Sequence, residues 1–234
     1  MLKNSLLDLA ENSISSHELP IGNGAFQVVT LAPWQLWLAS KDAGFKARIR
    51  AADATSIDGK WLALLLDFAG RRSPVVTGRG IVDHYFEAPR FAENVVVVGS
   101  SDESILALSR LRPAWVTFGG SFSEVIDAAR LSEIVAAVEA QNAAVVFVAL
   151  GSPKQEMWGR QIADVAGVSV VGIGGAIETV VGLRKRPSKL VQLLKIEFLQ
   201  RAVQDPKRFF PRIGQGLSII PRLASESIAI RLAK

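Results

Sequence analysis

Short, nearly continuous apolar runs alternate along the chain with longer segments whose apolar residues recur every three or four positions. The runs are rich in valine and span four to seven residues, which is typical of strands that a sheet buries on both faces. The pattern predicts strands at residues 27–31, 95–99, 114–120, 144–150 and 168–174, with weaker ones near 46–50 and 74–77. The segments between them predict helices at residues 33–44, 58–70, 101–111, 121–141 and 153–167.

This alternation predicts an α/β fold with a mostly parallel, doubly wound sheet of the Rossmann-like kind. Beyond about residue 184 the sequence contains no strand candidate. We therefore expect two parts, a Rossmann-like core over residues 1–183 and a basic helical appendage over residues 184–234.

Charge divides the chain at the same place. Residues 1–183 hold 15 Lys and Arg against 19 Asp and Glu, whereas residues 184–234 hold 12 against 3, so the second part supplies the net charge of +5. A basic segment on an acidic body predicts contact with an anionic partner, whether nucleic acid, lipid headgroups or a phosphorylated ligand. The alternative is a basic helix face that is simply solvated.

Composition removes several classes of site. The chain has no cysteine and only two histidines, His17 and His84, which excludes a disulfide scaffold, a cysteine nucleophile and thiolate or histidine-rich metal sites. The first residues lack the pattern of a signal peptide. The longest apolar runs, such as 144–151, fall short of the roughly 18–20 residues that span a bilayer. We therefore expect a cytoplasmic protein that is soluble or peripheral to a membrane.

Glycine ends four predicted strands just before a helix starts, in VVVVG-SSDES, VTFGG-SFSE, VFVALG-SPKQE and VVGIGG-AIE. A tight strand-to-helix turn explains any one of these glycines. Together they favour a nucleotide or phosphorylated ligand, because glycine lets a phosphate approach the backbone where helix N–H groups are free. The common nucleotide motifs are absent, however: there is no dinucleotide fingerprint, no Walker A sequence and no D-x-D pair.

Three local groups of polar residues are candidates for chemistry. Asp58, which precedes a glycine, stands where a strand gives way to a helix and serves either as a helix cap or as a base. The loop 151–156, GSPKQE, gathers hydrogen-bonding groups after an apolar strand, with a functional or a structural role. The basic run 184–189, RKRPSK, and the segment 197–212 supply guanidinium groups that suit bidentate contact with phosphate oxygens.

Taken in chain order, the stretches IDG, VTGR, VVVVGS, ALGSPKQEMW, GIGGAIETVVG, RKR and EFLQRAVQDPKR resemble the bacterial WecG/TagA/CpsF glycosyltransferases. The resemblance covers roughly residues 28–212, which is most of the chain. Its most specific part runs from the PKQE motif to the arginines near residue 212, across about 60 residues.

The resemblance implies an inverting transferase that needs no bound metal and no cofactor. Such enzymes move an N-acetylmannosamine-type sugar from a UDP-sugar donor to a polyprenyl-diphosphate-linked acceptor in surface polysaccharide biosynthesis. They act on the cytoplasmic face of the bacterial cell membrane, so the implied partners are the two substrates and an anionic membrane surface. Formation of a homo-oligomer is left open.

The resemblance also assigns residues. Asp58 matches the proposed catalytic base, Gln155 matches a residue of the sugar pocket, and Thr30 lies near the same cleft. The other implied substrate-binding residues come from the matching loops: Gly151, Lys154, Glu156, Gly174, Gly175 and Glu178. The basic segment is expected to close over the active site and to meet the membrane and the acceptor diphosphate through Arg186, Arg201, Arg208 and Arg212.

The apolar residues of the basic segment predict a membrane interface. Four of them recur at four-residue spacing, and eight more follow among the cations: Leu190, Leu194, Phe198 and Ala202, then Phe209, Phe210, Leu217, Ile219, Ile220, Leu223, Ile228 and Ile230. We expect these groups to insert among lipids while the cations meet anionic headgroups. The alternative is that they pack on the core or on another subunit.

The sequence departs from the family pattern at two positions near the expected pocket. Ala32 stands where the family usually has asparagine, and Gly80 replaces the acid of a G-x-D motif. These changes leave the donor sugar open. They also allow a catalytically weakened relative that binds a nucleotide-sugar or a lipid carrier as a scaffold, which the intact Asp58 and Gln155 oppose.

A nucleic-acid-binding protein is the third alternative, and it is disfavoured. It rests on the basic segment alone, which offers only Phe198, Phe209 and Phe210 for stacking on bases.

Overall fold

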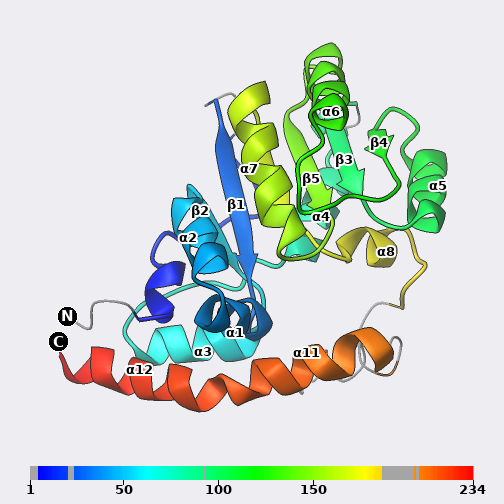
Figure 1. Ribbon diagram of the computed structural model, residues 1–234. Helices are drawn as coiled ribbons and strands as arrows, with labels where there is room; N and C mark the ends of the chain where they lie inside the picture. The colour runs from blue at the N-terminus through cyan, green and yellow to red at the C-terminus, as the bar shows by residue number, and fades with distance from the viewer. Residues whose placement is uncertain (1–4, 21–23, 92, 186–202, 204–205, 234) are drawn as a thin grey trace.

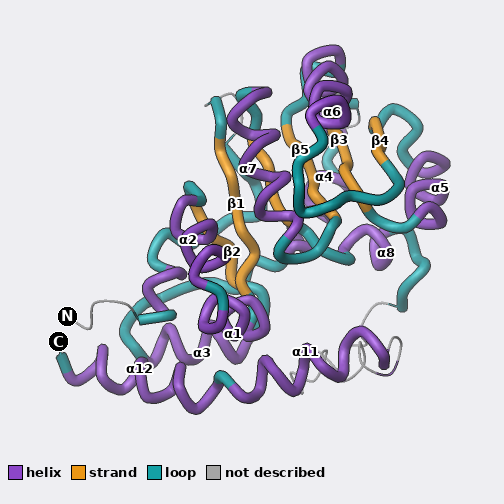
Figure 2. Tube along the Cα trace, in the orientation of Figure 1, coloured by secondary structure: helices purple, strands orange, loops and turns teal. Residues whose placement is uncertain are grey.

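The computed structural model describes residues 5–20, 24–91, 93–185, 203 and 206–233, without the side chains of Arg208 and Phe209. Six strands of the described residues form one sheet in which every neighbouring pair is parallel, in the order β2-β1-β6-β5-β3-β4. Figure 2 shows the strands in orange among the surrounding helices. The strands are β1 (Phe26–Leu31), β2 (Ala54–Ile57), β3 (Val95–Gly99), β4 (Val116–Phe118), β5 (Val145–Ala149) and β6 (Ser169–Gly172). The predicted Rossmann-like α/β fold is confirmed.

The valine-rich runs are continuous because helices cover both faces of the sheet. In β3, Val95 and Val97 pack with α4 (Gly78–Glu87) and α8 (Ala176–Val180) on one face. Val96 and Val98 pack with α6 (Ala128–Ala140) and α7 (Lys154–Ala166) on the other. Successive side chains of a strand point to opposite faces, so a strand buried on both must be apolar throughout. The helices around the sheet are α1 (Pro33–Lys41), α2 (Ala43–Ala51), α3 (Lys60–Phe68), α4 (Gly78–Glu87), α5 (Asp102–Leu111), α6 (Ala128–Ala140), α7 (Lys154–Ala166) and α8 (Ala176–Val180), with 3-10 turns η1 (Leu7–Ala10) and η2 (Pro89–Phe91).

Several predicted elements differ from the observed ones. The weak strand predicted near 46–50 is wrong, because this segment lies in α2, where Asp42 caps the helix and Phe45 and Ile49 share the buried face. The weak strand predicted at 74–77 is reduced to a single bridge. The helix predicted from 121 begins only at Ala128, because the Asp127 carboxylate accepts hydrogen bonds from the backbone N–H groups of the first turn.

Two of the elements that were not predicted bear on the site. Strand β2, ATSI, is too short and too polar to stand out as an apolar run. Helix α4 begins Gly-Arg-Gly, a start that reads as a turn, yet Thr77 caps it through a 2.9 Å hydrogen bond from the Gly80 N–H. Its residues Ile81 and Tyr85 are buried one helical turn apart in the core.

Helices α11 (Pro206–Ser218) and α12 (Ile220–Leu232) run nearly end to end along one edge of the molecule, beside α1 and α3 (Figure 1). Among the described residues, no helix has both the length and the apolar character that crossing a bilayer requires.

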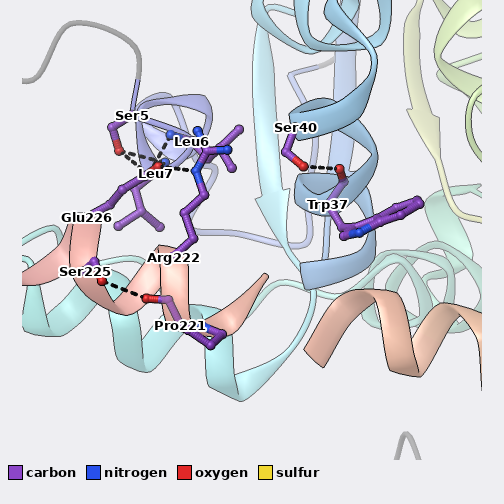
Figure 3. A network of polar contacts seen from close by, with 9 residues as sticks. All are labelled: Ser5, Leu6, Leu7, Trp37, Ser40, Pro221, Arg222, Ser225 and Glu226. Carbon is purple, nitrogen blue, oxygen red and sulfur yellow. Dashed lines mark hydrogen bonds and ion pairs between the residues drawn. The ribbon is translucent and has the colours of Figure 1, made fainter. Parts of the chain in front are cut away.

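Helix α12 is packed into the body. Leu223 is fully buried in a cluster with Leu6, Leu7, Leu62 and Leu66. Figure 3 shows the polar contacts beside this cluster, in which the Glu226 carboxylate accepts 2.7 Å hydrogen bonds from the Ser5 hydroxyl and the Leu6 N–H.

The expectation that Ile219 and Leu223 insert at a membrane is therefore wrong. Their side chains complete the core around β1 and α3, and burial there already removes them from water. The stripe at Leu190, Leu194, Phe198 and Ala202 lies outside the described residues. The division of the chain at residue 184 stays a proposal.

Candidate active site

A cavity of about 590 Å³ lies beyond the carboxyl ends of β1, β2, β5 and β6, where α11 and the start of α12 form part of its wall. This is the edge at which parallel α/β sheets bind ligands, and the volume suits a small organic molecule. Seven of the residues expected from the sequence line it: Thr30, Asp58, Gly151, Gln155, Gly174, Gly175 and Arg212.

Of the other residues expected at the site, three have described side chains. Lys154, Glu156 and Glu178 do not line the cavity. Arg208 belongs to α11 and its side chain is not described, while Arg186 and Arg201 lie outside the described residues.

Asp58 is not a helix cap. It follows β2, and its backbone N–H donates a 2.7 Å hydrogen bond to the carbonyl of Leu31. The residue at the cap position of α3 is Gly59, whose φ of 121° favours glycine, and α3 starts at Lys60 without a side-chain cap. Asp58 is half-buried and lines the cavity, and its carboxylate forms no hydrogen bond with a described residue.

Thr30, which lines the cavity, connects three strands through hydrogen bonds. Its hydroxyl donates a 2.7 Å hydrogen bond to the carbonyl of Gly172 in β6 and accepts one of 3.1 Å from Ser56 in β2. Thr30 is 6% exposed. The Thr30 hydroxyl therefore already donates its proton to a carbonyl of the sheet, and only a small part of the side chain is accessible to a ligand.

Gln155 joins two loops that border the cavity. Its side-chain oxygen accepts a 3.2 Å hydrogen bond from the N–H of Gly174, after β6. Its amide nitrogen donates to the Ser152 hydroxyl at 3.3 Å and to Glu156 at 3.1 Å, after β5. A Cβ atom on Gly172 would lie 2.9 Å from the Gln155 side chain, which explains glycine at that position. The loop therefore has a structural role as well as a place in the cavity wall.

Glu156 lies behind Gln155, 2% exposed. One of its oxygens accepts a 2.6 Å hydrogen bond from Ser152, and the other has no partner among the described residues. Burial raises the pKa of this carboxyl, and the hydrogen bonds from Ser152 and Gln155 oppose the rise only in part. The raised pKa favours the neutral acid, which avoids an uncompensated charge beneath the cavity.

Lys154 and Glu178 are held by protein partners. The ammonium group of Lys154 donates a 2.7 Å hydrogen bond to the carbonyl of Phe122, in the loop after β4. Glu178 forms an ion pair with Arg184, and each side chain is 17% exposed. Arg184 itself lines the cavity.

Three arginines reach the cavity from different parts of the chain. Arg79 comes from the first turn of α4, Arg184 from the end of the described core, and Arg212 from α11. The guanidinium carbon of Arg212 lies 4.5 Å from the centre of the Trp34 ring, a cation–π geometry that holds the arginine beside α1. Sequence reasoning missed Arg79 because α4 was not predicted, and it did not separate Arg184 from the rest of the RKR run.

A comparison with protein families identifies the family of the chain. The family model described as "Glycosyl transferase WecG/TagA/CpsF family" matches residues 5–232, nearly the whole chain. The chain belongs to this glycosyltransferase family. Membership means transfer of a sugar from a nucleotide-sugar donor to an acceptor, in the biosynthesis of a cell-envelope polysaccharide.

The two departures from the WecG/TagA/CpsF pattern occupy different places. Ala32 lines the cavity just before α1, so the longer side chain of the family's asparagine is missing from the cavity wall. Gly80 does not line the cavity. A Cβ atom there would lie 2.5 Å from the His17 ring, so His17 occupies the space that a side chain at this position needs.

The described residues of this glycosyltransferase contain no group of three or more histidine or acidic side chains placed to hold a metal ion.

Proposed function

We propose that this family member is an inverting glycosyltransferase that uses no bound metal. It moves an N-acetylmannosamine-type sugar from UDP to a sugar on a polyprenyl diphosphate. The observation that carries the proposal is the carboxylate of Asp58, which forms no hydrogen bond with a described residue and belongs to the lining of a cavity that three arginines also line.

The arginines supply the charge that the donor needs. A diphosphate leaving group gains negative charge as its bond to the sugar breaks, and fixed guanidinium groups stabilise that charge. Arg184 already forms a partly buried ion pair with Glu178, so its guanidinium is held in place before the donor binds. Arg79 is likewise paired with Asp83, at 3.6 Å on α4.

Asp58 supplies the base. In the proposed step, the Asp58 carboxylate takes the proton of the acceptor hydroxyl while that oxygen forms a bond to the anomeric carbon. The bond from the anomeric carbon to the diphosphate oxygen breaks, and its electron pair leaves with UDP. Attack opposite the leaving group inverts the anomeric centre.

The acceptor half of the proposal rests on the resemblance and on charge. The basic segment from residue 184 is suited to meet the acceptor diphosphate and an anionic membrane through Arg186, Arg201, Arg208 and Arg212. The protein is accordingly proposed to act at the cytoplasmic face of the cell membrane, in peripheral contact with it.

Release of UDP tests the proposal. Purified protein is incubated with a panel of UDP-N-acetylhexosamines and a short-chain prenyl-diphosphate acceptor sugar, and free UDP is measured. We expect acceptor-dependent release with one donor, and the same donor should raise the melting temperature by ligand linkage. Arg184→Gln should weaken donor binding, whereas Arg90→Gln, an exposed arginine outside the cavity, should not.

The same assay distinguishes an active transferase from the alternative, a catalytically weakened scaffold. Ala32 at the cavity wall is the feature that favours a scaffold. A donor that stabilises the protein without any acceptor-dependent release of UDP would support the scaffold and overturn the proposed transfer.

A further inference from the structure

Helix α3 presents an apolar stripe to solvent. Trp61, Leu64 and Phe68 are 54%, 45% and 56% exposed. Their spacing of three and four residues places them on one face of the helix, whereas Leu62 and Leu66 on the opposite face are fully buried. Large apolar side chains seldom gather on a solvent-facing surface unless the surface contacts a partner.

The helices at the end of the chain also carry exposed apolar side chains. Phe210 and Leu217, seven residues apart on α11, are 60% and 56% exposed, and Ile228 on α12 is 49% exposed. We call the combined surface the apolar rim, and its members are Trp61, Leu64, Phe68, Phe210, Leu217 and Ile228.

Contacts hold these residues in one neighbourhood. Trp61 and Leu217 both line the cavity, so they stand at its border from opposite ends of the chain. The Ser227 hydroxyl donates a 2.7 Å hydrogen bond to the carbonyl of Leu65, which fixes α12 beside α3. Ile228 follows Ser227 on α12, and its side chain is 49% exposed. Figure 1 shows the three helices along the same edge of the molecule.

Helices α11 and α12, which supply half of the apolar rim, are positively charged. Residues 206–233 contain five lysines and arginines and a single acid, Glu226. That acid is turned inward to Ser5 and Leu6 and also pairs with Arg222 at 3.0 Å. Lys207, Arg222 and Arg231 are exposed. Apolar groups bordered by cations are the arrangement of a surface that lies on anionic lipid.

We propose that the apolar rim docks on an anionic lipid bilayer and turns the mouth of the cavity toward the lipid. The inference rests on the proposed lipid-linked acceptor, because a polyprenyl chain stays in the bilayer while its diphosphate must reach the arginines. The proposed membrane contact thus includes α3 in the body of the protein, and not the basic segment alone. A second copy of the chain is the competing occupant, and the cationic border argues against it because two such faces repel each other.

Vesicle flotation of the full chain tests the proposal. The vesicles contain phosphatidylcholine with or without about one quarter phosphatidylglycerol. We expect binding only with the anionic lipid. The double variant Leu64→Gln, Phe68→Gln should lower the partition coefficient at least about tenfold, because two large apolar side chains lose their place in the lipid. The matched control Leu106→Gln, Leu111→Gln changes two leucines on α5 that are 55% and 52% exposed, and it should bind like the wild type.

Tryptophan fluorescence gives an independent readout. Trp61 is the most exposed of the five tryptophans, so insertion should shift the emission to shorter wavelength. The shift should disappear in Trp61→Phe while flotation persists.

Three results would overturn the docking surface. The first is that the wild type fails to float with anionic vesicles. The second is that the double variant floats as well as the wild type. The third is that sedimentation shows a dimer for the wild type and a monomer for the double variant, with no change in flotation. UDP release with the short-chain acceptor in solution should be unchanged in the double variant, since neither residue lines the cavity. Absence of that release in the wild type overturns the proposed function instead.

Discussion

The indole N–H of Trp34 donates a 2.9 Å hydrogen bond to the side-chain oxygen of Gln215, and it thereby joins α1 to α11 across 181 positions of the chain. The guanidinium of Arg212 lies against the same indole ring. One tryptophan therefore holds both the helix that borders the cavity and the arginine that reaches into it.

Trp34→Phe should loosen α11 without removing the aromatic face. A net hydrogen bond of this kind contributes about 0.5–1.5 kcal/mol, so we expect roughly twofold to tenfold faster amide exchange in residues 206–218. Hydrogen–deuterium exchange of the α11 peptides measures this. Gln215→Ala removes the same bond from the other side and should have the same effect; unchanged exchange in both variants would show that α11 is held by packing alone.

Asp58→Asn should lower turnover by roughly 10²–10⁴-fold and leave donor binding nearly intact, because the amide cannot accept the proton. Steady-state UDP release and a thermal shift with the donor give the two quantities. Asp67→Asn on α3 is the matched control, an exposed carboxylate outside the cavity. Normal turnover in Asp58→Asn would remove Asp58 from the role of base.

Gln155→Ala should lower stability and turnover together. The substitution removes the hydrogen bonds to Gly174, Ser152 and Glu156 and leaves buried polar atoms unpaired, which costs about 1–3 kcal/mol. Urea unfolding measures the stability and UDP release the turnover. If turnover falls while the midpoint of unfolding stays fixed, Gln155 acts on the substrate and contributes little to the joining of the two loops.

Glu156→Gln should change how stability depends on pH. Burial raises the pKa of Glu156 in the folded protein, so the folded state holds this proton more tightly than the unfolded chain. The resulting stability is complete below the ordinary carboxyl pKa of 4.5 and declines as the pH rises through the raised value. Glutamine cannot ionise, so the variant should lack this decline. Urea unfolding of both proteins between about pH 4 and pH 8 tests this, and parallel stability curves would contradict it.

Leu223→Ala should destabilise the protein by about 2–5 kcal/mol, since Leu223 is fully buried in the cluster around Leu6 and Leu66. Leu232→Ala, on the same helix but 82% exposed, should stay within about 0.5 kcal/mol of the wild type. Chemical denaturation compares them. Equal stability of the two variants would mean that α12 is an independent appendage and would support the division of the chain at residue 184.

The sequence by itself determined the sheet and the family. Five runs of valine and its neighbours predicted five of the six strands, because a strand covered on both faces must be apolar at every position. The motifs IDG and GSPKQE marked loops that the fold places at one cavity, because parallel strands all end at the same edge.

Only the tertiary structure decided how those loops are joined. Periodicity reports which positions are buried, but it does not report the partner that buries them. The bonds from Thr30 to Gly172 and from Gln155 to Gly174 connect residues 142 and 19 positions apart, and no local pattern encodes either pairing. Likewise, the apolar positions of the last helix read as one amphipathic pattern, yet Leu223 joins the core while Ile228 stays in solvent. That difference arises because α3 and η1 pack against one side of α12 and leave the other side uncovered.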